Sequence, residues 1–198
     1  MTLTPSACRL ERAGRALLAW CAFPGRVAAW LVLAITAAVL VAVTGNAMRA
    51  GTLLAWNTDL PLLGTQLTMT GLFDLQWHLF AVLVILAGPF ALAEDRHVRV
   101  DLVADRLSER GRAIVDLIGD LLLLLPFSAL IVWLSLPFVG FAFKSGEGSD
   151  YGGLVDRYLI KAIIPVGFAL LFGSALGRIL VNVARLLDSR GSRAAGEG

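Results

Sequence analysis

The sequence predicts an all-α integral membrane protein with four transmembrane helices. Of its 198 residues, 58% are hydrophobic and only 16% are charged, and the mean hydropathy is +0.78. A soluble domain would carry charge on roughly a quarter of its residues. Four apolar runs are each long enough for a bilayer core of about 30 Å, which takes about 20 helical residues. They cover residues 27–46, 72–93, 113–143 and 159–181.

The third run is longer than one upright crossing requires. As a straight helix it would extend about 46 Å. We therefore expect a tilted helix or a projecting end, with bends near Pro126 and Pro137.

The distribution of basic residues predicts the orientation. Of the 17 Lys and Arg residues, thirteen lie before the first run, between the second and third, and from Arg178 near the end of the fourth run onward. The remaining four are Arg49 in the first connection, and Lys144, Arg157 and Lys161 at and around the connection before the fourth run. Because cytoplasmic segments carry the excess of basic residues, both termini and the central connection are expected in the cytoplasm.

The N-terminal segment, residues 1–26, is predicted to form an amphipathic helix at the cytoplasmic headgroups. Pro24 and Gly25 are expected to end this helix before the first run. Its predicted apolar face consists of Leu10, Ala13, Leu17, Trp20 and Cys21.

The transmembrane domain is expected to cover residues 27–187. The connection between its second and third runs also shows helical periodicity, which predicts a second interfacial helix. A solvated charged loop remains the alternative reading of this connection. Its apolar positions are Val100, Val103, Ala104 and Leu107. Residues 188–198 are small and polar, which predicts a disordered cytoplasmic tail.

The ionisable residues argue against catalysis. His78 and His97 lie at opposite ends of the second run, about 28 Å apart along a helix, so they cannot bind one haem or metal ion. Cys8 and Cys21 lack the spacing of a metal site. No nucleophile-elbow, zinc-protease or phosphate-binding motif is present. We predict no enzyme, no metal and no cofactor. The alternatives are a stand-alone redox enzyme and a small channel or homo-oligomeric carrier.

Charged residues inside the runs are expected to pair, because an isolated charge in lipid is costly. Asp120 and Arg178 lie at matching depths and predict an intramembrane ion pair. Asp74 is expected to approach Lys161 or a partner subunit. The alternative is that each side chain reaches the headgroups independently.

Gly173 and Gly177 form a G-x-x-x-G pattern that allows helix backbones to approach closely. The pattern predicts helix packing, either within this chain or against another protein.

Five segments, in consistent order and spacing between about residues 27 and 187, carry a resemblance to a known family. They are residues 75–80, 96–101, 125–127 with 133–138, 145–149, and 158–168. Together they resemble the small membrane subunit of tripartite ATP-independent periplasmic (TRAP) transporters, in its mannitol/chloroaromatic-type branch. Two positions depart from the family pattern: Asp74 stands where relatives carry Glu, and Asp156-Arg157 where relatives often carry Pro-Tyr.

The resemblance implies an accessory scaffold rather than the carrier itself. In this family a large multi-span permease subunit contains the sodium-coupled substrate pathway, and a periplasmic binding protein delivers the solute, here expected to be an organic acid. The resemblance also implies the bacterial inner membrane, with the lipid bilayer and these two proteins as partners and no nucleic acid.

Two groups of residues are candidates for contacts. The outer cluster is expected to face the periplasm and to contact partner subunits; it consists of Asp74, Gln76, Trp77, His78, Glu147 and Lys161. The inner cluster is expected to anchor the second span at the cytoplasmic surface and support assembly; it consists of Arg96, His97, Arg99 and Asp101.

Overall fold

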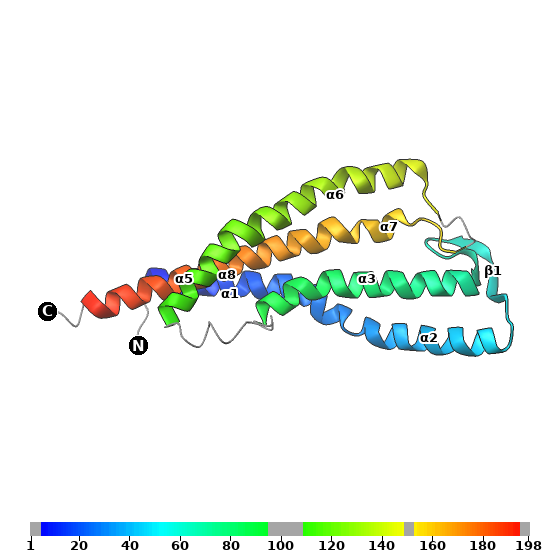
Figure 1. Cartoon of the computed structure of the whole chain (residues 1–198), viewed down its shortest axis with the longest axis horizontal. Helices are drawn as coiled ribbons and strands as arrows, with labels where there is room; N and C mark the ends of the chain where they lie inside the picture. The colour runs from blue at the N-terminus through cyan, green and yellow to red at the C-terminus, as the bar shows by residue number, and fades with distance from the viewer. Residues whose placement is uncertain (1–4, 95–108, 149–152, 195–198) are drawn as a thin grey trace. The chain divides into compact units, whose positions relative to one another are not determined.

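The computed structural model describes residues 5–94, 109–148 and 153–194 (Figure 1). These ranges are predominantly helical, and four helical segments in them are long and apolar enough to cross a membrane. They are Ala7–Ala47, Met69–Ala93, Arg110–Ser145 and Tyr158–Leu187. The prediction of a helical chain with four segments able to span a membrane is confirmed for length and composition.

The elements follow the chain in a simple order. The helices are α1 (Pro5–Ala28), α2 (Leu31–Ala47), α3 (Met69–Ala93), α5 (Glu109–Gly119), the π-helical turn η1 (Asp120–Leu124), α6 (Leu125–Ser145), α7 (Tyr158–Lys161) and α8 (Ile163–Ala194). Two strands, β1 (Thr52–Leu60) and β2 (Gly64–Thr68), lie between α2 and α3.

The strands form an antiparallel hairpin that the all-α prediction did not include. Thr52 pairs with Thr68 and Leu60 with Gly64, with irregular register between them. The indole Nε1 of Trp56 donates a hydrogen bond of 2.7 Å to the Gly64 carbonyl. Gly64 has a φ of 64°, a conformation that glycine adopts without strain. Because β1 lacks a clean alternation of apolar and polar residues, only its threonines and the turn residues signalled a hairpin.

Helix α1 continues past the predicted stop at Pro24 and Gly25. It ends at Ala28, and α2 begins at Leu31. A proline inside a helix removes one hydrogen bond and bends the helix without necessarily ending it. The predicted end of the N-terminal helix was therefore four residues early.

The third apolar segment is interrupted just before the first of its two prolines. In η1 the Leu125 N–H donates to the Asp120 carbonyl, five residues back. Pro126 has no N–H to continue the normal ladder, which accounts for the change of helix type at this point. Pro137 lies inside α6 without such an interruption.

The last helix is longer than predicted. Helix α8 runs to Ala194, so residues 188–194, which the sequence analysis assigned to a disordered tail, are helical. Pro165 falls in the first turn of α8, where a missing N–H costs no intrahelical hydrogen bond.

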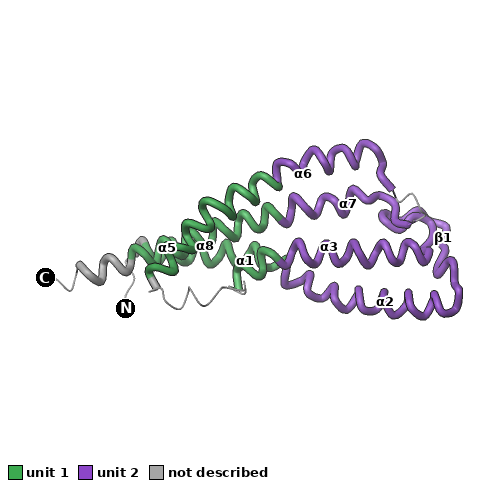
Figure 2. The backbone as a smooth tube through the Cα atoms, viewed as in Figure 1, with its two compact units in different colours: residues 1–24, 88–131, 168–198 green, residues 25–87, 132–167 purple. Residues whose placement is uncertain are grey.

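The chain divides into two compact units (Figure 2). Unit 1 comprises residues 1–24, 88–131 and 168–198, and unit 2 comprises residues 25–87 and 132–167. Many of the buried residues in both units are small, as expected where helices pack closely in a membrane.

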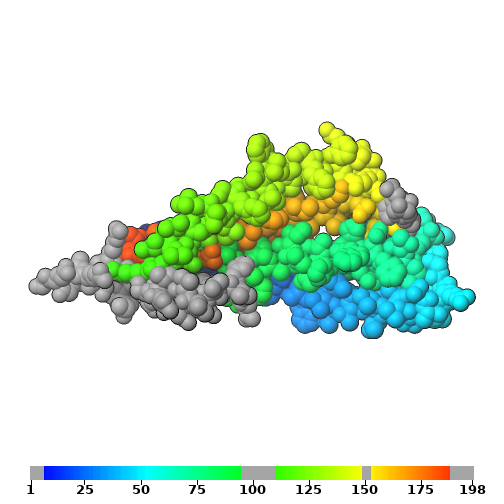
Figure 3. Space-filling view, viewed as in Figure 1, coloured from blue at the N-terminus to red at the C-terminus, as the bar shows by residue number. Residues whose placement is uncertain are grey.

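Large apolar side chains remain on the outside. On α6, Trp133 and Phe141 are each 72% exposed. Figure 3 shows side chains of the green-to-yellow segment standing out from the surface. This distribution, with small residues inside and large apolar residues outside, is that of a helix surrounded by lipid or by another membrane protein.

Candidate functional site

In unit 2, two members of the outer cluster meet where the chain passes from α6 to α7: Glu147 follows α6, and Lys161 is the last residue of α7. Lys161 Nζ donates to Glu147 Oε2 at 2.5 Å, and the two side chains are 22% and 35% exposed. Lys161 Nζ also lies 4.4 Å from the centroid of the Phe138 ring. The Arg157 N–H donates to the Glu147 carbonyl at 3.0 Å, so Glu147 holds the loop through both its side chain and its backbone.

Asp74 connects the same loop to α3. Its Oδ2 accepts a hydrogen bond of 3.4 Å from the backbone N–H of Leu154, whose side chain is 1% exposed. The next N–H, of Val155, donates to the Leu62 carbonyl in the hairpin turn at 3.0 Å. Loop, helix and hairpin are thereby joined in one structure, which we call the loop platform: residues 60–64, Asp74, Glu147, 153–157 and Lys161.

Asp74 was expected to approach Lys161 or a partner subunit, and the first of these is not present as a direct contact. Lys161 pairs with Glu147 instead, and the Asp74 carboxylate is used by a backbone N–H. Glu147 follows the end of α6 on the loop that returns to α7, so its carboxylate reaches the ammonium group of Lys161 directly.

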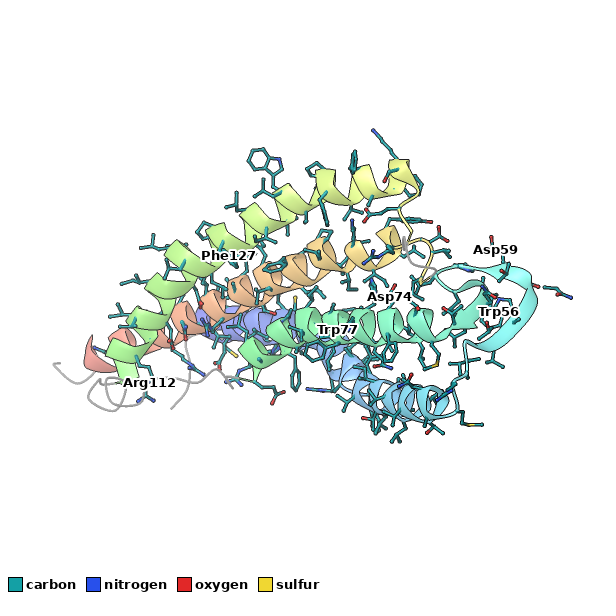
Figure 4. The ribbon with its side chains drawn as sticks, turned by 45° about the vertical axis from the view of Figure 1, so that its right-hand side comes forward. Trp56, Asp59, Asp74, Trp77, Arg112 and Phe127 are labelled. Atoms are coloured by element: carbon teal, nitrogen blue, oxygen red, sulfur yellow. The ribbon has the colours of Figure 1, made fainter. Side chains whose placement is uncertain are left out.

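The other three members of the outer cluster lie on α3 and differ in exposure and in hydrogen bonding; Figure 4 labels Trp77. Trp77 is 72% exposed. His78 Nδ1 lies 2.5 Å from the Asp74 carbonyl, which requires the proton on Nδ1. Gln76 Nε2 is buried without a hydrogen-bond partner in the described part of the chain. The structure therefore joins Asp74, Glu147 and Lys161 through the loop platform and does not bring Trp77 into it.

Sequence reasoning missed the residues that close the loop platform. Leu154, Val155 and Leu62 act through backbone groups, which carry no side-chain signature. Leu62 has a φ of 73° and Asp156 a φ of 52°, uncommon values for residues other than glycine. Such conformations persist only where the surroundings hold them.

In unit 1, the residues predicted as an intramembrane pair are in contact. Arg178 Nε donates to Asp120 Oδ2 at 2.6 Å, and Arg178 Nη2 donates to Asp120 Oδ1. Asp120 is fully buried, and the Arg178 side chain is 21% exposed. The two parallel bonds match the planar guanidinium to the carboxylate.

The aspartate of this pair belongs to the π-helical turn. Asp120 is the first residue of η1, and π turns recur at functional positions of helices. Also in unit 1, Phe127 packs edge-on against Phe168 with 6.0 Å between ring centroids. Figure 4 labels Phe127 on α6 and Arg112 on α5.

The glycine pattern of α8 packs against α1 within unit 1. A Cβ atom at Gly173 would lie 2.7 Å from Cys21 Sγ, and one at Gly177 would lie 2.9 Å from the Gly14 carbonyl. A Cβ at Gly14 would lie 2.6 Å from the Gly177 carbonyl. Residue numbers rise along α1 as they fall along α8, so the two helices are antiparallel. Of the two alternatives, the structure shows packing within the chain.

This contact changes the predicted face of α1. Within unit 1 the buried positions of α1 are Ala7, Gly14, Cys21 and Ala22. Cys21 belongs to the predicted apolar face, whereas Trp20, assigned to the same face, is 79% exposed. The reason is that α8 selects the small residues of α1 for close approach and leaves the bulky ones outside.

The inner cluster lies outside the described residues. Arg96, His97, Arg99 and Asp101 all fall in the undescribed range 95–108, together with the second predicted interfacial helix.

A comparison with protein families decides the class of this chain. The model described as tripartite ATP-independent periplasmic transporters, DctQ component, matches residues 63–185, more than half of the sequence. The chain belongs to the DctQ family. No curated protein and no solved structure matches it. The match extends from the hairpin turn into α8 and includes both ion pairs described above. A DctQ protein is a transporter component, not an enzyme.

Proposed function

We propose that this DctQ protein is the scaffold subunit of a TRAP transporter of the mannitol/chloroaromatic-type branch. It supports a large permease subunit that performs sodium-coupled uptake of an organic acid, and a periplasmic binding protein delivers that acid. Membership of the family supports a transporter component; the scaffold role, the branch and the substrate class are our inference.

One observation carries the scaffold role. The fully buried carboxylate in the candidate spans, that of Asp120, is held by both nitrogens of the Arg178 fork. A carboxylate in a two-bond pair holds helices together and is poorly suited to releasing a proton or an ion in each transport cycle. The pair thus supports a static role for this subunit. In this proposal the ion pathway lies in the large subunit.

The loop platform is the proposed contact surface for partners outside the membrane. Its backbone is held by Asp74 and by the pair of Glu147 with Lys161. A surface that is held rigid before binding loses little conformational entropy on docking. In this proposal Trp77 and the outer cluster lie on the periplasmic side, and both termini lie in the cytoplasm, in agreement with the distribution of basic residues.

The direct test is affinity purification of the tagged chain from native membranes in mild detergent. The proposal expects one large polytopic protein in roughly equal amount. Recovery of the chain alone, across several detergents, would reject the accessory role.

Orientation is tested separately with single cysteines at exposed positions, after replacement of Cys8 and Cys21. A cysteine at Asp59, in β1, should react with an impermeant maleimide in intact spheroplasts. A cysteine at Arg12, in α1, should react only after the membrane is opened. The reverse pattern would invert the proposed topology.

A further inference from the structure

Helix α1 exposes one row of side chains that changes character along its length. At steps of three and four residues this row contains Arg9, Arg12, Ala16, Trp20 and Phe23, all exposed. The first two are basic, and the last two are aromatic, with 79% and 61% exposure. Residues at this spacing share one face of a helix.

The orientation of this row is set by backbone contacts. Gly14 lies against Gly177 and Val181 of α8 so closely that a Cβ atom would overlap with both. Helix α1 therefore cannot rotate without separating from α8, and the row must face away from this contact.

The same end of unit 1 carries a basic residue from α8. Gly14 lies opposite Val181, and the helices are antiparallel. Arg12 precedes Gly14 by about 3 Å of helical rise, and Arg185 follows Val181 by about 6 Å, in the same direction. Arg9, Arg12 and Arg185 are all exposed. We call these three residues the basic end of unit 1.

Among the described side chains, the acidic residue of α1, Glu11, pairs with Arg15 and not with the basic end. Glu11 Oε1 accepts hydrogen bonds from Arg15 Nε at 2.9 Å and from Arg15 Nη2 at 2.6 Å. Glu11 is therefore engaged by Arg15 rather than by the neighbouring Arg12. A shallow, open depression of about 540 Å³ lies over α1 here and is lined by Cys8, Glu11, Arg12, Arg15 and Ala16.

We propose that the basic end of unit 1 binds the headgroups of anionic phospholipids. The arginines supply charge complementary to a phosphodiester, and Ala16 leaves space beside them. Trp20 and Phe23 follow Arg12 by about 12 and 16 Å along the helix, where an acyl chain attached to that headgroup would lie. The combination of cation, then exposed aromatic side chain, fits the boundary between headgroups and hydrocarbon. An acidic protein segment would match the arginines but not the adjoining aromatic surface.

The test measures lipid selectivity of the full chain, together with any subunit that it retains, in phosphatidylcholine vesicles. Trace spin-labelled phosphatidylglycerol or phosphatidylcholine reports the relative association constant of each lipid. Wild type should prefer phosphatidylglycerol, and Arg12→Gln should lower the preference by about fivefold, the effect of one arginine at a charged surface. The triple variant Arg9→Gln, Arg12→Gln, Arg185→Gln should abolish it, and so should high salt.

Arg49→Gln, in the connection before the hairpin, is the matched control and should retain the wild-type preference. Equal association of the two lipids with wild type would overturn the proposal. That result is expected if a protein, and not lipid, covers these arginines. Full preference in a folded triple variant would overturn it as well. Displacement of the lipid by millimolar inorganic phosphate would indicate a site for free anions instead.

Discussion

Asp120 and Arg178 form a two-bond ion pair that joins η1 to α8 inside unit 1. The carboxylate is fully buried, so without the guanidinium it would be an uncompensated charge in an apolar surrounding. The pair is thus a point at which a small chemical change should have a large effect on stability.

Asp120→Asn should lower the free energy of unfolding by about 3–5 kcal/mol, because it removes the buried charge that accepts both hydrogen bonds from the Arg178 guanidinium. The measurement is thermal or denaturant unfolding in detergent. Asp59→Asn, at an exposed position of β1, is the control and should change stability by less than about 0.5 kcal/mol.

The double variant Asp120→Leu, Arg178→Leu tests whether the loss of stability comes from breaking the charge pair or from lost side-chain packing. Replacing both members by apolar groups should recover much of the loss, because no buried charge remains. If Asp120→Asn unfolds like wild type, the pair does not stabilise the fold.

Gly177→Ala should destabilise unit 1 by about 1–3 kcal/mol, because the added methyl group meets backbone atoms of α1 that cannot move independently. A Cβ there lies 2.9 Å from the Gly14 carbonyl and 3.2 Å from the Leu18 nitrogen. Gly140→Ala is the matched control in α6, where a Cβ meets nothing within 4 Å. Since alanine is the better helix former, this control should be neutral or stabilising. Equal behaviour of the two variants would contradict the α1–α8 packing.

Asp74→Ala should loosen the loop platform. The Leu154 N–H loses its acceptor, a bond of about 1 kcal/mol, so its amide exchange should accelerate about fivefold. Hydrogen exchange of a peptide that covers residues 153–158 measures this. Trp77→Phe, on the same helix but outside the platform, should leave the exchange of that peptide unchanged.

Lys161→Gln should have a smaller effect than loss of the Asp120 pair. Both side chains of the Glu147–Lys161 pair are partly exposed, so solvent screens the charge that remains, and we expect a loss of about 1 kcal/mol. Adding Glu147→Gln should restore part of it. A loss as large as that of Asp120→Asn would mean that the platform is more deeply buried in the assembled transporter.

The spans were predictable because long apolar runs have few alternatives in a chain this hydrophobic. Asp120 and Arg178 could be matched for the same reason, since helical rise converts sequence position into depth. The face of α1 could not be read this way. Periodicity selects bulky apolar residues, whereas close helix packing selects small ones. Trp20, which was predicted on the apolar face, is therefore exposed, and Gly14, which was not assigned to it, is buried.

The loop platform shows a second limit of sequence reasoning. Lys161 has two carboxylates within plausible reach, Asp74 and Glu147, and only the path of the loop decides between them. That path depends on the backbone bonds of Leu154 and Val155 and on the hairpin turn. Backbone bonds between segments distant in sequence leave no residue pattern to find.

The central claim is that this chain is a necessary accessory of a carrier and not a carrier itself. The most direct measurement is sodium-driven uptake of an organic acid into proteoliposomes, supplied with the binding protein. Uptake should require both this chain and the large subunit, and neither alone should support it. Uptake by this chain alone, or undiminished uptake by the large subunit without it, would contradict the account.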